Sequence, residues 1–514
     1  METETHNSLI RAASGVTLAG QIELAMRRYA TRPAIREGAH VTTFGRLAER
    51  SASLVAGLAA LGVGQGDRIA VLSENRTEYL ELLVAAARGG FILCAQNWRL
   101  APEELLHCVA LVEPKVILAS PRFSAKVKEL WPQTPLITFG PAYESMASTL
   151  APMPRRAIDP EDGVVILYTS GTTGRPKGAL ISQRAEVARA AVSAIDIPTS
   201  ADEAFLAWAP LFHMVSTDPA FGAFMKGAEV IVTDGYDPQV LADLVTKHRL
   251  GHLIVMPGMV ESFLDALTAT GLPPKGVRWV GVMADLLPRH QLQAITTALN
   301  APYVNSFGST ETGSPPGTAG KIAVGALPDN LDKIVNVLCE IRLVDEEDRD
   351  VPMGEAGELA IRGPATFSGY WNNPEATSEA FKGGWYHMGD MFRETPEGAL
   401  QFVDRRKYLI KTGGENVYPA EIEQVLMSLP QVADTVVVRA SDPKWGEVPV
   451  AFVTLKSPTS AEALLQVCAQ RLARYKRPAR IIFVEDAELP RSTTGKIMRH
   501  LLEEALAQGR FEGR

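Results

Sequence analysis

The chain has 514 residues, 46% of them hydrophobic, which at about 150 residues per domain is enough for two to four domains. Its net charge of −8 supplies no basic field for a nucleic acid or an anionic membrane, so we expect a small-molecule substrate. The N-terminus lacks a signal-peptide pattern, and no run approaches the roughly 18 to 20 apolar residues of a membrane span. We therefore expect a protein that is neither exported nor membrane-spanning.

From residue 17 onward, segments with helical apolar spacing alternate with short apolar runs typical of strands. This alternation predicts parallel sheets covered by helices in a large α/β region. The expected helices are 44–63, 77–90 and 238–249, and the expected strands are 67–73, 114–120, 227–235, 252–258 and 277–285.

The pattern changes near residues 337–363, where acidic, turn-rich stretches separate the strands and predict a small antiparallel, β-barrel-like portion. A unit with both strand and helix patterns follows, and its length of about 110 residues suits an independent α+β lid. We expect an N-terminal domain over residues 1–404, a mobile C-terminal domain over 405–514, and a hinge near 404–407.

The four cysteines stand far apart, without the spacing of a metal site, and each lies in an apolar stretch. Buried free thiols are the expected state of such cysteines. We therefore expect a reducing, cytoplasmic compartment.

The stretch "YTSGTTGRPKGAL" (168–180) follows the apolar run "GVVIL" and is dense in glycine and hydroxyl side chains. Glycines allow close backbone approach, hydroxyls add donors and Lys177 adds a mobile charge, which together suit a polyphosphate. The spacing is not that of a Walker A loop. A solvated linker has a similar composition, so this stretch alone leaves both interpretations open.

The same stretch resembles the phosphate-loop signature of the adenylate-forming superfamily, which contains acyl-CoA synthetases, carrier-protein adenylation domains and firefly luciferases. Further motifs follow in the family's order along nearly the whole chain: "PLFHM", "NSFGSTETG", "GWYHMGD", "DRRKYLIKTGGENVYPAEIE" and "LPRSTTGKIMR". The chain looks most like an acyl-CoA synthetase. The resemblance implies ATP, Mg²⁺ and coenzyme A as cofactor and co-substrates.

The resemblance also implies a nucleotide site. Phe307 is similar to the aromatic residue that stacks on adenine, and Asn305 to a partner of its amino group. Glu311 resembles the carboxylate that coordinates Mg²⁺. Asp390 and Arg405 resemble the residues that contact the ribose or phosphates. The remaining implied contacts of ATP are Thr169, Ser170, Gly171, Thr172, Thr173, Gly174, Gly308 and Thr310.

Further residues carry implied roles in catalysis, domain motion and binding of the other substrates. Lys496 resembles the mobile lysine that enters the site for adenylation, and Lys407 occupies the hinge position. His213 resembles a residue that orients the substrate carboxylate, although a single histidine among apolar residues is more often part of a core. The predicted acyl pocket comprises His213, Met214, Met256, Met283 and Ser306. The predicted CoA contacts are Gly413, Gly414, Glu415, Trp445, Arg474 and Lys476.

These implications describe an ATP-dependent carboxylic acid:CoA ligase that forms an acyl-adenylate and pyrophosphate, and then acyl-CoA and AMP. The alternatives are an enzyme that loads a carrier protein, a luciferase-like oxygenating enzyme, and a non-enzymatic nucleotide-binding protein. Relatives commonly have Gly-Gly-Ala-Pro where this chain has residues 283–286. If Met283 projects into the pocket, it favours an aromatic or medium-length aliphatic acid; alternatively, it lies in the core behind the pocket. The resemblance is compatible with a homodimer.

Overall fold

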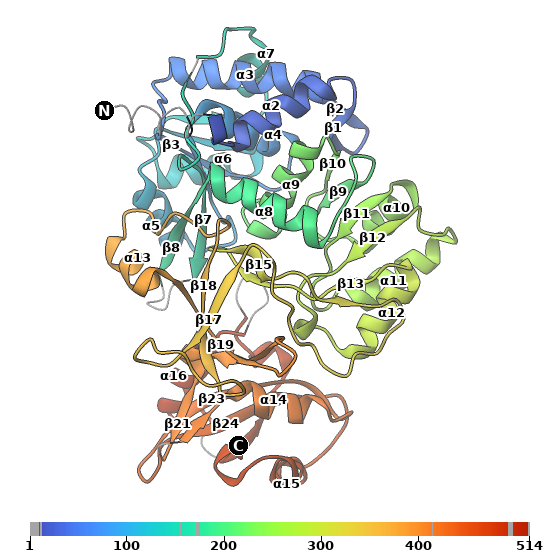
Figure 1. Cartoon of the computed structure of the whole chain (residues 1–514), viewed down its shortest axis with the longest axis vertical. Coiled ribbons are helices and arrows are strands. Elements are labelled where there is room, and N and C mark those ends of the chain that lie inside the picture. The colour runs from blue at the N-terminus through green and yellow to red at the C-terminus, as the bar shows by residue number, and fades with distance from the viewer. Residues whose placement is uncertain are drawn as a thin grey trace. The chain divides into compact units, whose positions relative to one another are not determined.

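The computed structural model describes residues 10, 13–154, 156–170, 175–413, 415–491 and 497–511 (Figure 1). The chain forms two compact units. The first comprises Met1–Ile341 and Ile361–Tyr386, and the second comprises Arg342–Ala360 and His387–Arg514. The predicted boundary near residue 404 stays a prediction. In this division, the strands just before that residue belong to the same compact unit as the C-terminal segment.

The first unit contains a six-stranded sheet in the order β6-β5-β3-β4-β7-β8. Its neighbouring strands are parallel, except that β7 and β8 form an antiparallel hairpin. The interior strands β4 and β5 are buried along their whole length, as expected for parallel strands covered on both faces. The strands are β3 (Arg68–Leu72), β4 (Ile92–Ala95), β5 (Val116–Ala119), β6 (Leu136–Thr138), β7 (Gly163–Ser170) and β8 (Pro176–Ser182).

A second sheet of the same unit has eight strands among the described residues, in the order β16-β13-β12-β11-β9-β10-β1-β2. Its interior pairs are parallel, and only the outermost strands β2 and β16 pair antiparallel with their neighbours. The strands are β1 (Pro33–Glu37), β2 (His40–Thr43), β9 (Ala204–Ala207), β10 (Val230–Val232), β11 (Leu250–Leu253), β12 (Val277–Val280), β13 (Tyr303–Val304) and β16 (Lys321–Ile322). A short hairpin, β14 (Phe307–Ser309) and β15 (Gly313–Gly317), follows β13.

Helices connect these strands, as the alternating pattern predicts (Figure 1). Their ends follow local chemistry: the Thr43 side chain caps α3 by accepting from Arg46 N, and Gly90 ends α4 in the left-handed region. The helices of this unit are α2 (Leu18–Arg28), α3 (Phe44–Ala60), α4 (Thr77–Gly89), α5 (Pro102–Val112), α6 (Pro121–Leu130), α7 (Pro141–Ser148), α8 (Gln183–Asp196), α9 (Met214–Lys226), α10 (Pro238–Lys247), α11 (Val260–Thr270), α12 (Arg289–Leu299) and α13 (Pro374–Ala380), with 3-10 turns η1 (Ala284–Leu286) and η2 (Lys382–Gly384). The predicted large α/β region with parallel sheets is confirmed.

The second unit holds most of a four-stranded sheet, β17-β18-β19-β20, and a five-stranded sheet, which runs β22-β21-β24-β23 with β25 beside β24. The four-stranded sheet occupies the place of the predicted barrel-like portion. The strands are β17 (Glu340–Val344), β18 (Gly357–Arg362), β19 (Tyr386–Glu394), β20 (Leu400–Arg405), β21 (Ile410–Thr412), β22 (Glu415–Val417), β23 (Val432–Asp442), β24 (Gly446–Leu455) and β25 (Arg480–Phe483). The helical elements are α14 (Pro419–Met427), α15 (Ala461–Arg471), α16 (Arg499–Ala507), η3 (Arg406–Tyr408), η4 (Arg474–Lys476) and η5 (Asp486–Glu488).

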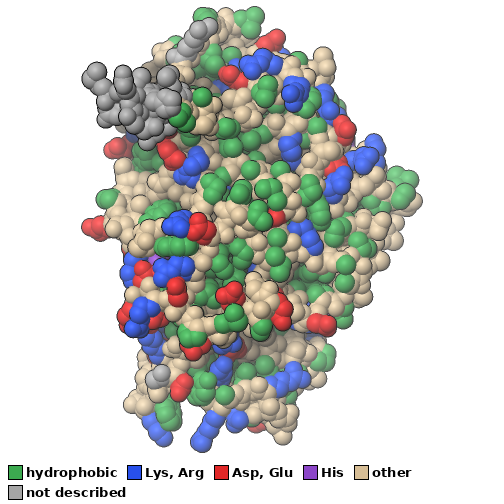
Figure 2. All heavy atoms as spheres, viewed as in Figure 1, with side chains coloured by type: hydrophobic (Ala, Val, Ile, Leu, Met, Phe, Trp, Pro, Cys, Tyr) green, Lys and Arg blue, Asp and Glu red, His purple; other side chains and the backbone are tan. Residues whose placement is uncertain are grey.

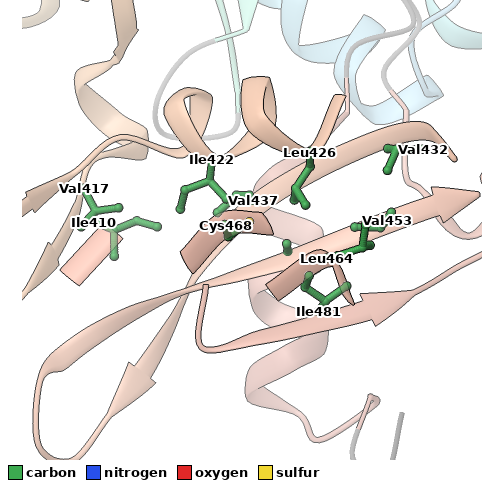
Figure 3. Close-up of a cluster of buried hydrophobic side chains, with 11 residues drawn as sticks. Ile410, Val417, Ile422, Leu426, Val432, Val437, Val453, Leu464, Cys468 and Ile481 are labelled. Carbon is green, nitrogen blue, oxygen red and sulfur yellow. The ribbon is translucent and has the colours of Figure 1, made fainter. Parts of the chain in front are cut away.

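The second unit has its own hydrophobic core. Figure 3 shows Ile422 and Leu426 of α14 and Leu464 of α15 on the same side of the sheet as Val437 and Val453. All five side chains are buried. Because this core is built from residues of the second unit alone, the predicted smaller α+β domain is confirmed as a compact body.

Three of the four cysteines are buried and Cys339 is half-buried, and all four are free thiols, as the spacing predicts. Basic and acidic side chains are interspersed on the face drawn in Figure 2. In the part of the chain that the structure describes, no helix combines the length and apolar character needed to cross a bilayer.

Candidate active site

Three side chains from distant parts of the first unit meet at one place. The Tyr370 hydroxyl donates a hydrogen bond to Glu311 Oε1 over 2.9 Å. Lys177 Nζ lies 4.8 Å from the centroid of the Tyr370 ring. Tyr370 reaches this position because its segment runs beside β8, where Trp371 N donates to Gly178 O over 2.7 Å. The structure thus joins the predicted loop lysine to the predicted magnesium ligand through a tyrosine.

Tyr370 stays protonated and acts as a donor. Burial raises the pKa of Tyr370, and the neighbouring Glu311 carboxylate raises it further. Tyr386 makes hydrogen bonds with Ser309 and Tyr370, and burial raises its pKa as well. One neutral phenol therefore bonds the Glu311 carboxylate, which is only 8% exposed, and a second neutral phenol bonds the first.

A tight hairpin turn presents Glu311. Thr312 Oγ1 accepts from Ser309 N over 3.0 Å and donates to Pro315 O over 2.7 Å, which closes the turn. Gly308 is needed for this closure, because a Cβ there would lie 2.0 Å from Gly313 O. These contacts fix the predicted site residues of β14 and of the turn after it, where Phe307 is buried and Thr310 is half-buried.

Arg189 of α8 makes hydrogen bonds that hold the same turn in place. Its guanidinium donates to Thr310 O over 3.0 Å, to Ala365 O over 3.2 Å and to Asp218 Oδ2 over 3.1 Å. Burial raises the pKa of Asp218 and of the adjacent Glu186, while Arg189 opposes the shift. No sequence pattern predicts this network, because arginine and acidic side chains on helices usually mark solvated faces.

Asn305, predicted to contact the base, makes its hydrogen bonds within the protein. Asn305 is buried, and its amide group donates to Leu331 O over 3.0 Å and to Asp332 O over 3.1 Å. Its side-chain oxygen accepts a hydrogen bond from Lys333 Nζ. Asn305 therefore connects the end of β13 to the 331–333 segment, a role that its motif did not predict.

On the β7–β8 hairpin, Thr169 lies directly opposite Lys177. The predicted phosphate-loop residues Gly171, Thr172, Thr173 and Gly174, together with the Ser170 side chain, Gly414 and Lys496, lie outside the described residues.

The predicted acyl-pocket residues lie on separate turns. His213 is the N-cap of α9, and its Nδ1 accepts from Val215 N over 3.2 Å, so the ring proton is on Nε2. Met283 is the N-cap of η1. Ser306 is buried, and its N–H donates to Val282 O over 2.9 Å, which places it next to the Met283 segment. His213, Met214, Met256 and Met283 are all half-buried.

In the second unit, Asp390 and Arg405 are cross-strand partners on β19 and β20. Arg405 Nε lies 3.0 Å from Asp390 Oδ1, and the aspartate side chain is 2% exposed. The arginine therefore stabilises the buried carboxylate. Asp390 of the "GWYHMGD" motif and Arg405 of the "DRRK" motif therefore form an ion pair.

The predicted CoA residues Gly413 and Trp445 also meet. Gly413 N donates to Trp445 O over 2.8 Å, and a Cβ on Gly413 would lie 2.7 Å from the indole Cε3. With φ at +60°, this position favours glycine for a second reason. Trp445 is 48% exposed.

The other predicted residues of this unit are mostly at the surface. Glu415 and Arg474 are exposed, whereas Lys476 Nζ is already paired with Glu421 Oε2 at 2.5 Å. The predicted hinge residue Lys407 lies in η3, and its backbone carbonyl accepts from Arg439.

A metal would have to be held by few protein ligands. Among the described residues, no group of three or more His, Cys, Asp and Glu side chains lies together as a metal cage. Mg²⁺ is commonly held by one or two carboxylates and the phosphates of a nucleotide. Glu311, whose Oε1 is oriented by Tyr370, fits that requirement.

Two family models cover most of the chain. The model of the AMP-binding enzyme matches residues 22–371, and the model of the AMP-binding enzyme C-terminal domain matches residues 421–496. The chain belongs to the AMP-binding enzyme family. Its two matched segments lie on either side of the predicted hinge.

This AMP-binding enzyme is similar over nearly its whole length to known CoA ligases. It is 32% identical to indoleacetate–CoA ligase of Aromatoleum aromaticum, with 93% of this chain and 96% of the relative covered. It is 32% identical to feruloyl-CoA synthase of Amycolatopsis sp, with 91% and 94% covered. The solved o-succinylbenzoate CoA synthetase of Bacillus subtilis with its acyl-adenylate superimposes with a TM-score of 0.82 at 27% identity, covering 94% of this chain and 97% of that one.

Proposed function

We propose that this protein is an ATP-dependent ligase that joins an aromatic carboxylic acid to coenzyme A. The observation that carries the proposal is the full-length similarity to CoA ligases, combined with the meeting of Lys177, Tyr370 and Glu311. The relatives are named for indoleacetate, ferulate and 2-succinylbenzoate, all aromatic acids, which supports an aromatic acid here.

The first half-reaction joins the acid to AMP. A carboxylic acid with a pKa of about 4 to 5 is ionised at neutral pH, so its oxygen attacks the α-phosphorus without a general base. The α-phosphorus bond to pyrophosphate breaks as the acyl-adenylate forms. Negative charge grows on the α-phosphoryl oxygens and on pyrophosphate, so the reaction depends on positioned cations.

Two lysines, one from each unit, supply this charge stabilisation. Lys177 brings a cation to the phosphates, and we assign Lys496 the same task on the transferring group. Tyr370 and Arg189 keep the Glu311 turn in place by bonding the side chain and the backbone. Mg²⁺ held by Glu311 would neutralise phosphate charge when it is bound.

We assign the nucleoside to Phe307, which would stack on the base, and to Asp390 with Arg405, which would bind the ribose. The Asp390 carboxylate is fixed by its ion pair, so it is oriented before a ribose hydroxyl reaches it. We retain Lys407 as the residue about which the C-terminal domain turns between the two half-reactions.

The second half-reaction transfers the acyl group to a thiol. The thiolate attacks the acyl carbon, AMP leaves, and a thioester remains. We assign the wall of the thiol path to Gly413 and Trp445, because they form a compact pair with an exposed indole face. For the phosphates of CoA, exposed Arg474 is better suited than Lys476, whose charge is paired with Glu421.

The test is an assay of AMP and thioester with ATP, Mg²⁺ and an acid panel, with and without CoA. The panel contains indoleacetate, ferulate, 2-succinylbenzoate and aliphatic acids of graded length. We expect CoA-dependent AMP release with an aromatic acid. Adenylate that accumulates despite CoA, and is discharged only by a phosphopantetheine carrier protein, would instead identify a carrier-loading enzyme.

A further inference from the structure

An ion pair outside the predicted motifs, Lys333 with Asp285, lies at the edge of the eight-stranded sheet where two of its parallel strands end. Strands β12 and β13 are adjacent and parallel, and the segments after their carboxyl ends are 281–286 and 305–307. Ligands of α/β sheets bind outside such carboxyl ends. The two segments are bonded to each other, because Ser306 N donates to Val282 O over 2.9 Å.

Lys333 ties these segments together. Its ammonium group donates to Asp285 Oδ2 and to Asn305 Oδ1. The Lys333 side chain is 1% exposed, whereas that of Asp285 is 27% exposed. Burial lowers the pKa of Lys333, and the Asp285 carboxylate opposes this shift. A buried ammonium without a partner is costly, so this ion pair fixes the aspartate in place.

Asn305 is already committed to the protein. Its nitrogen donates to two backbone carbonyls, those of Leu331 and Asp332, and its oxygen accepts from Lys333. Both N–H donors of the amide are therefore used, and its acceptor is shared with a cation. The most accessible polar member of the cluster is Asp285, whose carboxylate has a second oxygen for another donor.

We propose that Asp285 determines the preference of the enzyme for the nucleotide base, by accepting a hydrogen bond from the 6-amino group of adenine while Lys333 holds the carboxylate in position. This inference rests on the proposed function, in which Phe307 stacks on the base. Phe307 begins β14 immediately after the segment that Lys333 and Val282 fix. A 6-oxo purine presents an acceptor instead of a donor at that place, so a carboxylate repels it.

The test changes the Asp285 side chain from a hydrogen-bond acceptor into a donor. Asp285→Asn keeps the shape but has only one oxygen, which Lys333 engages, so the amide N–H faces the base. Binding of ATP and of inosine triphosphate, its 6-oxo analogue, is measured by titration calorimetry without acid or CoA. We expect the preference for ATP to fall about 10- to 100-fold, since a hydrogen bond to a charged group is lost and a repulsion is removed.

Two further variants keep the test decisive. Asp285→Asn together with Lys333→Gln replaces the ion pair by two amides. This double variant leaves no unpaired buried ammonium, so it serves if the single variant does not fold. The same loss of preference is expected. Asp265→Asn makes the same chemical change at an exposed position of α11 and should leave the preference unchanged.

An unchanged preference in both Asp285 variants would overturn the proposal. Because binding is measured without the other substrates, an error in the acid or the thiol acceptor does not affect this result. Conversely, a protein that distinguishes the two nucleotides but forms no thioester would contradict the proposed function and leave the role of Asp285 standing.

Discussion

The nucleotide-side residues of the first unit and the CoA-side residues of the second differ in how they are held. Glu311 is 8% exposed and is bonded by Tyr370, while its turn is bonded by Arg189. Trp445 is 48% exposed; its ring lies beside Gly413 and Lys444, and its backbone N–H donates to Asp442 Oδ1. Buried groups held by several hydrogen bonds keep their charges in fixed positions, which adenylation needs. An exposed aromatic side chain suits contact with a long, flexible substrate arm.

The largest expected effect tests the fixed charge. Glu311→Gln removes the carboxylate that would hold Mg²⁺ but keeps a partner for Tyr370, so adenylate formation should fall by about 10² to 10³. ATP–pyrophosphate exchange measures this step. Thioester formation from supplied acyl-adenylate should be nearly unchanged. An equal fall in both steps would contradict the assignment of adenylation to the Glu311 region and of thiol binding to the Trp445 region.

The next effect tests the second region. Gly413→Ala places a Cβ 2.7 Å from the indole and strains a residue at φ +60°, so Trp445 must move. We expect thioester formation to fall by about 10-fold or more, with a loss of about 1 to 2 kcal/mol in unfolding free energy. Adding Trp445→Ala removes the contact, and chemical denaturation should show part of the stability recovered. No recovery would mean that the contact is not the cause.

A smaller effect isolates the bond that joins Tyr370 to Glu311. Tyr370→Phe keeps the ring beside Lys177 but removes the donor, so the adenylation rate should fall by about 10-fold, in line with one hydrogen bond to a charged group. The Mg²⁺ concentration for half-maximal rate should rise in parallel. A change in stability without a change in the Mg²⁺ requirement would show that the hydroxyl is only structural.

The smallest effect concerns acid size. If Met283 limits the pocket, Met283→Gly should shift preference toward longer acids, by about 0.8 kcal/mol per added buried CH₂. The measurement is kcat/KM over acids of graded length. Loss of stability with an unchanged length preference would place Met283 in the core behind the pocket.

Much of the fold and part of the site were predictable from local patterns. The helix and strand at 77–90 and 67–73 were predictable because their apolar spacing is a local property, and the structure has α4 and β3 there. Asp390 and Arg405 come from motifs close in the chain, and their pairing on adjacent strands follows from a short hairpin. A domain boundary is harder to predict from sequence than a helix, because it depends on which strands pack together, and here residues 342–360 join 387–514 in one unit.

The family, the order of its motifs and the kinds of side chain available for phosphate, base and thiol chemistry can all be read from the amino-acid sequence. Three contacts could be found only in the folded chain: Tyr370 links Lys177 to Glu311, Arg189 bonds the Glu311 turn, and Lys333 pairs with Asp285 and Asn305. These partners are separated by tens to hundreds of residues. A motif records residues that are neighbours in the chain, whereas a buried charge is satisfied by whichever donor the folded sheet brings to it.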